Sequence, residues 1–182
     1  MLNNKLKNIA IIGFGYWGPN IVRNFSNHYQ CKVRYICDAE KSARDRAKAA
    51  YPNITVIADP NIIFSDDDID IVAIVTPVST HYNLAKSAID SGKHVFLEKP
   101  MTNTLHEAEI LIKSAEEKNV VCVVDHTFLF TGAVLKIKEI IDSGDIGDVI
   151  YFDSVRVNLG LLQNDVDVIW DLAPHDLSIL FY

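Results

Sequence analysis

The sequence predicts an α/β protein: a doubly wound parallel sheet followed by the beginning of a second, α+β domain. Short apolar runs alternate with helical patterns five or six times over residues 1–125, which calls for a parallel sheet with helices on both faces. The first apolar run ends in a glycine-rich turn. Beyond residue 125 the pattern changes to a longer segment that is polar at alternate positions, as in a sheet with one open face.

The glycine-rich turn, Gly13-Phe-Gly-Tyr-Trp-Gly18, is the strongest single indication of function. It follows a charge-free apolar run, residues 9–12. Gly13 allows a tight turn, Gly15 lets the backbone approach a pyrophosphate, and Gly18 lets the next helix pack closely on the strand. Pro19 suits the first turn of that helix, whose free N–H groups would face bound phosphate.

An acidic residue stands where a dinucleotide-binding fold needs one. Asp38 ends the second apolar run, 20 residues after Gly18, where it can meet the adenosine ribose hydroxyls. The structural alternative is a capping Asp beside a glycine turn that binds no ligand. Because Asp38 would repel a 2′-phosphate and no Arg follows immediately, we expect NAD(H) rather than NADP(H). Residues 1–125 are therefore predicted to form a Rossmann domain with strand order 3-2-1-4-5-6.

Turn and cap residues set the bounds of the other elements in this domain. Tyr51-Pro52 ends one helix, Thr104 is a possible cap for another, and Gly92 follows a third. We expect strands at about residues 8–12, 32–38, 55–58, 70–75, 94–97 and 120–124, and helices at about 19–27, 41–50, 79–91 and 105–118.

Residues 126–182 are predicted to begin a second domain without completing it. A helix is expected at 131–142, a strand at 149–157 and a helical segment at 165–182. One strand cannot form a stable sheet, so we expect the chain to stop just after entering this domain. The unpaired edges of that strand invite pairing with another copy, which predicts either a homo-oligomer or a poorly ordered tail.

The composition limits the function classes. The 182 residues are 49% hydrophobic and 23% charged, with a net charge of −7 and no basic stripe, so we expect no nucleic-acid partner. No apolar run approaches the length of a membrane span, and the polar N-terminus is not a signal peptide. Three cysteines without CxxC spacing predict reduced thiols in a cytoplasmic protein. We expect no metal, because no HExxH motif, cysteine cluster or carboxylate cage is present.

Four polar groups mark candidate chemistry. Three follow predicted strands, at the edge where an open sheet binds its ligand, and the fourth lies in the final helical segment: Thr76-Pro77 with His81, Glu98-Lys99-Pro100, Asp125-His126, and Asp171-Leu-Ala-Pro-His175.

Together with the glycine turn, these motifs resemble the glucose–fructose oxidoreductase / inositol dehydrogenase / rhizopine catabolism family of NAD(P)-dependent sugar oxidoreductases. The turn, Thr76-Pro77 with His81, Glu98-Lys99-Pro100 and Asp171-x-x-x-His175 follow the family's order and spacing. The resemblance covers all 182 residues. It implies a C-terminal antiparallel sheet, used for substrate binding and dimerisation, that this chain lacks.

The resemblance implies a cofactor site and a catalytic group. The cofactor site comprises the glycine-turn residues Gly13, Phe14, Gly15, Tyr16, Trp17 and Gly18, together with Asp38, Thr76, Pro77, His81, Glu98 and Lys99. Glu98 would bond the cofactor ribose, and Pro100 would fix the turn. Lys99 would lie beside the nicotinamide as a fixed positive charge that favours an alkoxide-like state of the reacting hydroxyl. The structural alternative for Lys99 is a surface lysine before a turn-forming proline.

His175 is the candidate general base, since imidazole can accept a proton near neutral pH. If Asp171 and His175 are both helical they share a face, and the carboxylate can orient the ring. Pro174 would remove the helix bond to Trp170 and kink the helix; alternatively the helix begins near Asp171, which then serves as N-cap. A capping Asp with a surface His is the alternative without catalysis.

Other candidates are single residues. His81 can equally cap a helix, and His126 can equally be structural. Arg156 and Asn158 share a face of the predicted strand, which lines the sugar site in the family; an exposed polar sheet face explains them equally well.

The sequence thus predicts an oxidoreductase that moves a hydride between nicotinamide and a hydroxyl carbon of a sugar, cyclitol or nucleotide sugar. Two alternatives stay open: a non-catalytic dinucleotide-binding module, and a glycosidase or transferase that uses NAD transiently.

Overall fold

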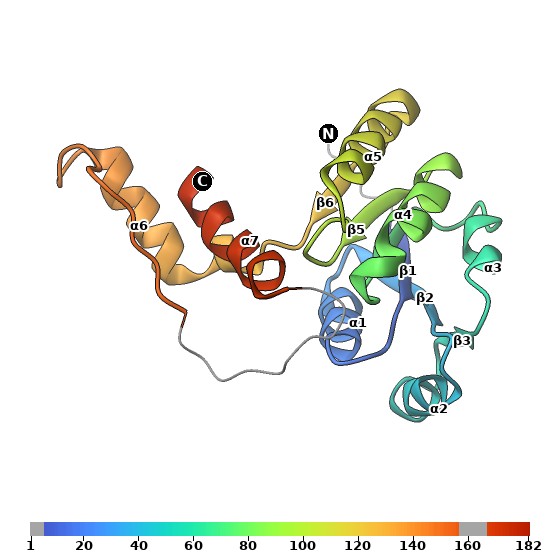
Figure 1. Cartoon of the computed structure of the whole chain (residues 1–182). Coiled ribbons are helices and arrows are strands. Elements are labelled where there is room, and N and C mark those ends of the chain that lie inside the picture. Colours follow the sequence, from blue (N-terminus) through green and yellow to red (C-terminus); the bar gives the residue numbers. More distant parts are fainter. Residues whose placement is uncertain (1–5, 157–166) are drawn as a thin grey trace. The chain divides into compact units, whose positions relative to one another are not determined.

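The computed structural model describes residues 6–156 and 167–182. The chain divides into two compact units, Met1–Val124 and Asp125–Tyr182. The first holds six strands and five α-helices, drawn from blue to yellow in Figure 1: β1 Lys7–Ile12, α1 Gly18–Asn27, β2 Cys31–Cys37, α2 Lys41–Ala50, β3 Thr55–Ile57, α3 Asn61–Phe64, β4 Ile71–Ile74, the short 3₁₀ helix η1 Val78–Thr80, α4 His81–Asp90, β5 His94–Leu97, α5 Leu105–Lys118 and β6 Cys122–Val124.

The six strands form one parallel sheet in the order β3-β2-β1-β4-β5-β6. This confirms the predicted doubly wound class and the predicted strand order. Each expected strand and helix of the first domain is present, with its ends within about two residues of the expected ones. The order places β1 beside β4. From β1 to β3 the strands are added on one side of β1, and from β4 to β6 on its other side, so the switch point lies between β1 and β4. A ligand crevice forms at such a switch point, at the carboxyl ends of the strands.

The core explains why these runs become strands buried on both faces. Successive side chains of a strand point to opposite faces. Ala10 and Ile12 of β1 therefore join one hydrophobic cluster, with Ala85, Ile89 and Leu111 from α4 and α5. Ile9 and Ile11 join the other, with Ile21 and Val22 of α1 and Ala43 and Ala47 of α2. All four β1 side chains are at most 4% exposed, which accounts for the absence of charge in this run.

The glycine turn is formed by close backbone contacts. Gly13 has φ +102°, and a Cβ built on it would lie 2.5 Å from the carbonyl oxygen of Val75. A Cβ on Gly18 would lie 2.6 Å from the carbonyl oxygen of Gly13, whereas one on Gly15 would meet nothing within 4 Å. Only a residue without a side chain fits at Gly13 and Gly18, while Gly15 leaves open space.

Cap residues stand at the starts and ends of the helices largely as expected. Thr104 and Glu107 form a reciprocal capping box at the start of α5, which satisfies two backbone N–H groups that would otherwise lack partners. Gly92 follows α4 with φ +74°. The helix expected from residue 79 begins instead with η1, and α4 starts at His81.

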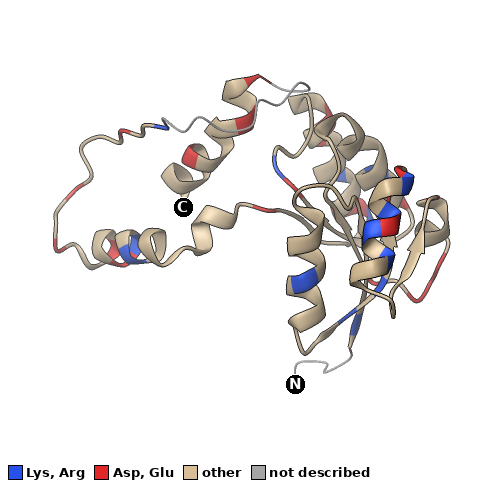
Figure 2. Cartoon of the chain, turned by 90° about the horizontal axis from the view of Figure 1, so that it is seen from below, with Lys and Arg blue, Asp and Glu red and all other residues tan. Residues whose placement is uncertain are grey.

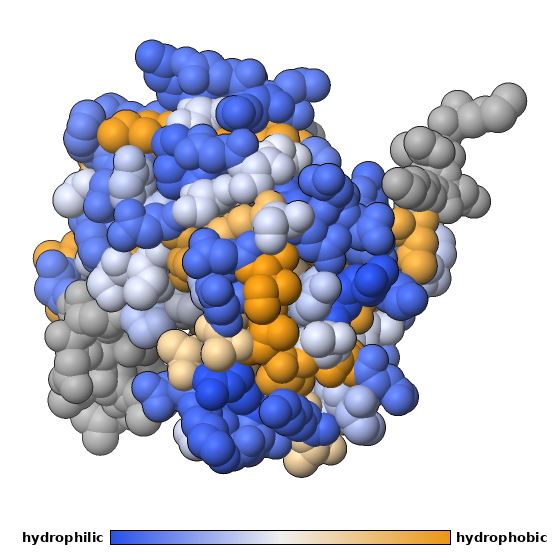
Figure 3. Space-filling view, turned by 90° about the vertical axis from the view of Figure 1, so that its right-hand side faces the viewer, coloured by the Kyte–Doolittle hydropathy of each residue, from blue (hydrophilic) through white to orange (hydrophobic). Residues whose placement is uncertain are grey.

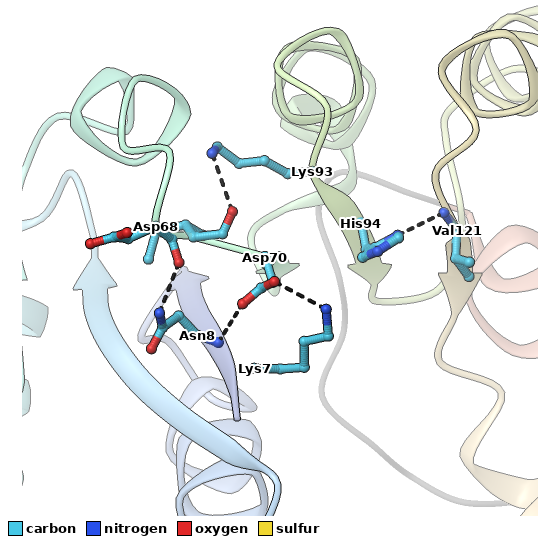
Figure 4. A network of polar contacts seen from close by, with 8 residues as sticks. Lys7, Asn8, Asp68, Asp70, Lys93, His94 and Val121 are labelled. Atoms are coloured by element: carbon cyan, nitrogen blue, oxygen red, sulfur yellow. Dashed lines mark hydrogen bonds and ion pairs between the residues drawn. The ribbon is translucent and has the colours of Figure 1, made fainter. Parts of the chain in front are cut away.

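Polar and charged groups link the strands at their amino ends, opposite the crevice (Figure 4). Asp70 accepts hydrogen bonds from the backbone N–H of Asn8 and from Lys7 Nζ, at 2.9 and 3.1 Å. Lys93 is 3% exposed, and its Nζ donates to the carbonyl oxygens of Asp66 (2.7 Å) and Ile69 (3.3 Å). His94 Nδ1 accepts from the backbone N–H of Val121 at 3.0 Å.

The second unit contains the 3₁₀ helix η2 Thr127–Phe130 and the helices α6 Gly132–Ser143 and α7 Val168–Phe181. The strand expected at 149–157 is wrong for the residues described: 149–156 have no regular secondary structure, and Val157 lies outside the described residues. A strand requires a partner for its backbone N–H and C=O groups, and none of the described residues pairs with this segment.

The helix around Pro174 also differs from one expectation. α7 runs through Pro174, and Asp167 is its N-cap, with Oδ1 accepting from the N–H of Trp170 at 2.9 Å. The alternative in which Asp171 caps the helix is therefore wrong. Asp171 and His175 both lie within α7, four residues apart.

The surface mixes both charges. Basic and acidic residues are interspersed along the helices (Figure 2), and several form i,i+4 pairs such as Lys86–Asp90 and Lys138–Asp142. The face of the first unit that carries α2 and α3 is mostly hydrophilic, with a band of hydrophobic residues exposed at its centre (Figure 3). Within the described part of the chain, no helix has the length and apolar character needed to cross a membrane.

Alanine substitutions at the three glycines should have unequal effects on stability. Gly18→Ala forces a Cβ against a backbone oxygen and should lower the free energy of unfolding by about 1–3 kcal/mol. Gly13→Ala adds the cost of its left-handed φ, about 1–2 kcal/mol. Gly15→Ala is the matched control and should stay within about 0.5 kcal/mol of the parent. Urea unfolding followed by circular dichroism measures all three, and equal losses would contradict the packing described.

Lys93→Met should destabilise the fold although Met is apolar and of similar length. The substitution leaves the carbonyl groups of Asp66 and Ile69 without the Lys93 donor, at a cost of about 1–3 kcal/mol. Lys86→Met is the control, because its pair with Asp90 is on the surface and such pairs contribute about 0–1 kcal/mol. A Lys93→Met protein as stable as the control in urea would show that the ammonium contributes nothing.

Candidate functional site

A cavity of about 710 Å³ lies at the carboxyl ends of β1 to β4, within the first unit. Its walls come from the glycine turn, the turn after β2, the turn after β3 and the segment from β4 into α4. The lining residues are Ile12, Gly13, Gly15, Cys37, Asp38, Ala39, Glu40, Ser42, Ala43, Arg46, Ala58, Pro60, Val75, Thr76, Pro77, Ser79, Thr80, Asn83 and Leu84. The cavity therefore occupies the place where an open parallel sheet binds its ligand.

Asp38 joins two walls of the cavity. Its Oδ2 accepts from the backbone N–H of Phe14 at 2.7 Å, and its Oδ1 accepts from the N–H of Glu40 at 2.8 Å. The carboxylate thus fixes the glycine turn against the turn that opens α2. Each carboxylate oxygen has a second lone pair, so Asp38 can still accept a hydrogen bond from a ligand hydroxyl.

Sequence reasoning missed several residues of the cavity. Arg46 in α2 lines it, and its guanidinium donates to the carbonyl oxygen of Phe14 at 3.1 Å. Asn83 and Leu84 of α4 line it as well. Their positions in the sequence offered a signal. Arg46 lies in α2, the helix that follows Asp38, and Pro60 lies in the turn after β3.

The turns after β4 and β5 are joined by one side chain. His81 is 1% exposed, and its ring nitrogens lie 2.8 Å (Nε2) from the carbonyl oxygen of Thr76 and 2.9 Å (Nδ1) from that of Pro100. The Thr76 and Thr80 hydroxyls are 2.6 Å apart, and Thr80 also donates to the carbonyl oxygen of Pro77. The backbone N–H of Glu98 donates to Ile74 at 3.0 Å, which places Glu98 and Lys99 at the end of β5.

The proposed cofactor residues separate into two groups. Gly13, Gly15, Asp38, Thr76 and Pro77 line the cavity. The others do not line it: Phe14 and His81 are buried, Gly18 packs against Gly13, Tyr16 and Trp17 are exposed with their rings 5.4 Å apart, and Glu98 and Lys99 are half-buried at the end of β5. The Phe14 side chain packs edge-on against Tyr51, so only its backbone belongs to the turn.

The second unit places a polar cluster around His175. The Phe128 ring lies edge-on to the His175 ring, with centroids 4.7 Å apart. The Arg156 guanidinium lies 4.9 Å from the Phe128 ring centroid, and its Nε donates to Asp176 Oδ2 at 2.6 Å. Ser154 donates to the other oxygen of Asp176 at 2.7 Å. The Arg156 hydrogen bond holds the pKa of the Asp176 carboxyl below its usual value.

The remaining candidates of this unit lie at its beginning and in α7. Asp171 lies one turn before His175 in α7. The Nδ1 atom of His126 is buried and has no hydrogen-bond partner among the described residues. Burial lowers the pKa of His126, although the neighbouring Asp125 carboxylate acts in the opposite direction. Asn158 lies outside the described residues.

The three cysteines are free thiols. Burial raises the pKa of Cys37 to about 12 and that of Cys122 to about 11, which keeps both protonated and poorly nucleophilic at neutral pH. In the described residues, no group of three or more His, Cys, Asp or Glu side chains is arranged to hold a metal ion.

Several named proteins are similar to this chain in sequence. The chain is 36% identical over 146 residues to the uncharacterized oxidoreductase YdgJ of Escherichia coli (strain K12), covering 75% of this chain and 42% of that protein. It is 33% identical over 129 residues to the scyllo-inositol 2-dehydrogenase (NAD⁺) of Bacillus subtilis (strain 168), covering 68% and 38%. It is 28% identical over 174 residues to the UDP-N-acetylglucosamine 3-dehydrogenase of Acidithiobacillus ferrooxidans (strain ATCC 23270), covering 93% and 52%.

A solved structure of another protein has a similar fold. The crystal structure of an NAD-binding protein from Listeria innocua superposes with a TM-score of 0.83 at 25% identity, covering 97% of this chain and 54% of that one. The chain thus spans about half the length, or less, of the proteins it matches. Residues 7–126 match the family model described as the oxidoreductase family with an NAD-binding Rossmann fold. The chain belongs to this glucose–fructose oxidoreductase / inositol dehydrogenase / rhizopine catabolism family.

Proposed function

We propose that the protein is an NAD-dependent oxidoreductase that transfers a hydride between nicotinamide and a hydroxyl-bearing carbon of a sugar, cyclitol or nucleotide sugar. The observation that carries the proposal is the cavity at the carboxyl ends of β1 to β4, which the glycine turn and the Asp38 carboxylate line together. A glycine turn before a helix suits a pyrophosphate, and a carboxylate beyond the second strand suits a ribose.

The cavity offers a distinct environment for each part of the dinucleotide. The adenosine ribose would bond Asp38, and the pyrophosphate would lie over Gly15, where the structure leaves open space beside the backbone. The nicotinamide half would extend toward Thr76 and Pro77, at the end of β4. NAD is preferred because a 2′-phosphate would face the Asp38 carboxylate, while Arg46 already bonds the Phe14 carbonyl.

The chemistry we propose needs a cation and a base. Lys99 would act as a fixed positive charge that favours the alkoxide-like state of the substrate. In the oxidative direction His175 takes the hydroxyl proton, and Asp171, one turn earlier in α7, orients its ring. Bound NAD⁺ would supply the acceptor for the hydride, so the hydroxyl carbon of the substrate would become a carbonyl carbon.

The substrate class rests on the relatives and on the resemblance. Two relatives are named for scyllo-inositol and UDP-N-acetylglucosamine, and both of these molecules carry ring hydroxyls. His126 and Arg156 are proposed as substrate contacts, although Arg156 bonds Asp176 in this structure. We propose further that residues 126–182 begin a substrate and dimerisation domain, and that the protein is a cytoplasmic homo-oligomer.

A second candidate is a dinucleotide-binding module without catalysis. One observation favours it: every residue that lines the cavity lies in the first unit, so that unit can bind a dinucleotide by itself. Turnover with a panel of inositols, sugars and nucleotide sugars separates the two candidates. Binding of NAD without hydride exchange on any of these compounds would favour the module.

Lys99→Ala and His175→Ala should each lower turnover strongly while they preserve cofactor binding. We expect kcat to fall by about 10²–10³-fold for Lys99→Ala, through loss of charge stabilisation, and by about 10²–10⁴-fold for His175→Ala, through loss of the base. Lys118→Ala and His106→Ala, at exposed positions of α5, are the matched controls. NADH formation and calorimetric NAD affinity are measured on each protein, and unchanged turnover in either site variant would remove that residue from the mechanism.

Asp38→Asn should narrow the discrimination between NAD and NADP. The substitution removes the charge that repels a 2′-phosphate, so the ratio of the two dissociation constants should change by about tenfold, or about 1.4 kcal/mol. The ratio cancels any general loosening of the glycine turn, because both cofactors share that turn. Glu40→Gln is the control for charge at the cavity wall. Parent protein that binds both cofactors equally would contradict the role of Asp38.

A further inference from the structure

His81 is placed between two hydrogen-bond acceptors. Its Nε2 lies 2.8 Å from the carbonyl oxygen of Thr76, and its Nδ1 lies 2.9 Å from the carbonyl oxygen of Pro100. The side chain is 1% exposed. Both distances are those of good hydrogen bonds, and the two carbonyls belong to the turns that follow β4 and β5.

The two acceptors determine the protonation state of the ring. A backbone carbonyl oxygen can only accept, and a neutral imidazole has a single N–H. In the neutral form one ring nitrogen would direct its lone pair at a carbonyl lone pair, whereas the imidazolium donates to both. We infer that His81 is a buried imidazolium in the folded protein, and that its two N–H groups hold the turn after β4 and the turn after β5 at a fixed spacing.

The two carbonyl acceptors favour a cation at this position. Charge-assisted hydrogen bonds are roughly twice as strong as neutral ones, which offsets part of the cost of burying a charge. The turn after β4 carries no ionisable side chain, and the turn after β5 carries Glu98 and Lys99.

Several ionisable groups on α4 and on the neighbouring helix α5 are engaged with other partners. On α4 itself, the Lys86 ammonium is paired with the Asp90 carboxylate at 2.6 Å, and Tyr82 is the neighbouring residue of His81. On α5, which packs against α4, Glu107 at the first turn is bound in the capping box.

The two turns are those to which the proposed function assigns the reactive end of the cofactor. Thr76 and Pro77 line the cavity, and Lys99 directly precedes Pro100. His81 is therefore a positioning residue: it fixes the nicotinamide wall relative to Lys99 without touching either cofactor or substrate. This kinetic consequence rests on the proposed function, whereas the charge state does not.

His94 provides an internal reference of opposite character (Figure 4). Its Nδ1 accepts from the backbone N–H of Val121 at 3.0 Å. An accepting nitrogen carries no proton, so His94 must be neutral, with its proton on Nε2. His81 lies beyond the carboxyl ends of the strands, whereas His94 lies at the amino end of β5. One spectrum can report both rings.

Nitrogen-15 NMR of the intact protein at pH 7, with labelled histidine, tests the charge state directly. Ring signals are assigned through correlations to the backbone amides of His81 and His94, so no variant is needed. We expect both nitrogens of His81 to resonate in the imidazolium range and to carry protons, while Nδ1 of His94 resonates as a bare acceptor. One protonated and one bare nitrogen at His81 would overturn the inference.

Kinetics of His81→Gln and His81→Phe test the positioning role. A small displacement of Lys99 relative to the cofactor should lower kcat by about 10–100-fold, with the KM for NAD held within about threefold. His94→Gln is the matched control, which should lose stability without this loss of kcat. A folded His81→Gln protein with parental kcat would overturn the positioning role. A parent protein without hydride transfer, but with an imidazolium at His81, would refute the proposed function and leave the charge state supported.

Discussion

Backbone contact at the glycine turn is the constraint on which the rest of the first unit depends. A side chain on Gly13 would collide with the Val75 carbonyl, and one on Gly18 would collide with the Gly13 carbonyl. Because neither has one, the short turn that joins β1 to α1 packs directly against the end of β4. That packing creates the wall of the cavity, and Asp38 then fixes the turn from the side of β2.

The fold could be predicted because its causes are local. A parallel sheet buried on both faces leaves short charge-free runs in the sequence, and β1 and β4 show this pattern clearly. The N-cap of α5 is likewise predicted from Thr104, whereas its capping-box partner Glu107 was not singled out from the sequence. The second unit was less predictable: residues 149–156 have the alternation of a strand, but alternation describes a face and cannot supply a partner. The cap of α7 was missed because Asp167 and Asp171 are both plausible caps, and only the backbone path decides between them.

The candidate site was predicted in part for the same reason. Gly13, Gly15, Asp38, Thr76 and Pro77 follow strands directly, so the sheet carries them to one edge. Arg46 and Asn83 lie within helices, α2 and α4. Whether they line the cavity therefore depends on how these helices pack on the sheet. The role of His81 depends on two backbone carbonyls, one of them 19 residues away, which no side-chain motif records.

Two sets of polar contacts described above, one in the first unit and one around Asp176, bond different kinds of partner. In the first, a buried ammonium, a buried imidazole and a carboxylate all bond backbone groups, at Lys93, His81 and Asp38. In the second, side chains bond each other, as Arg156 and Ser154 do with Asp176. Backbone groups are supplied by any sequence that keeps the fold, whereas a side-chain pair is lost when either member changes.

The charged network at the amino ends of the strands has an evolutionary consequence. Asp70, Lys93 and their backbone partners join the strands at the edge away from the cavity. At the other edge, Gly13, Gly18, Asp38 and His81 hold the turns in place, so the fold depends on these positions there. Mutational drift at the remaining positions of those turns can alter ligand preference with a smaller penalty in foldedness, so one scaffold can give rise to descendants that act on different molecules.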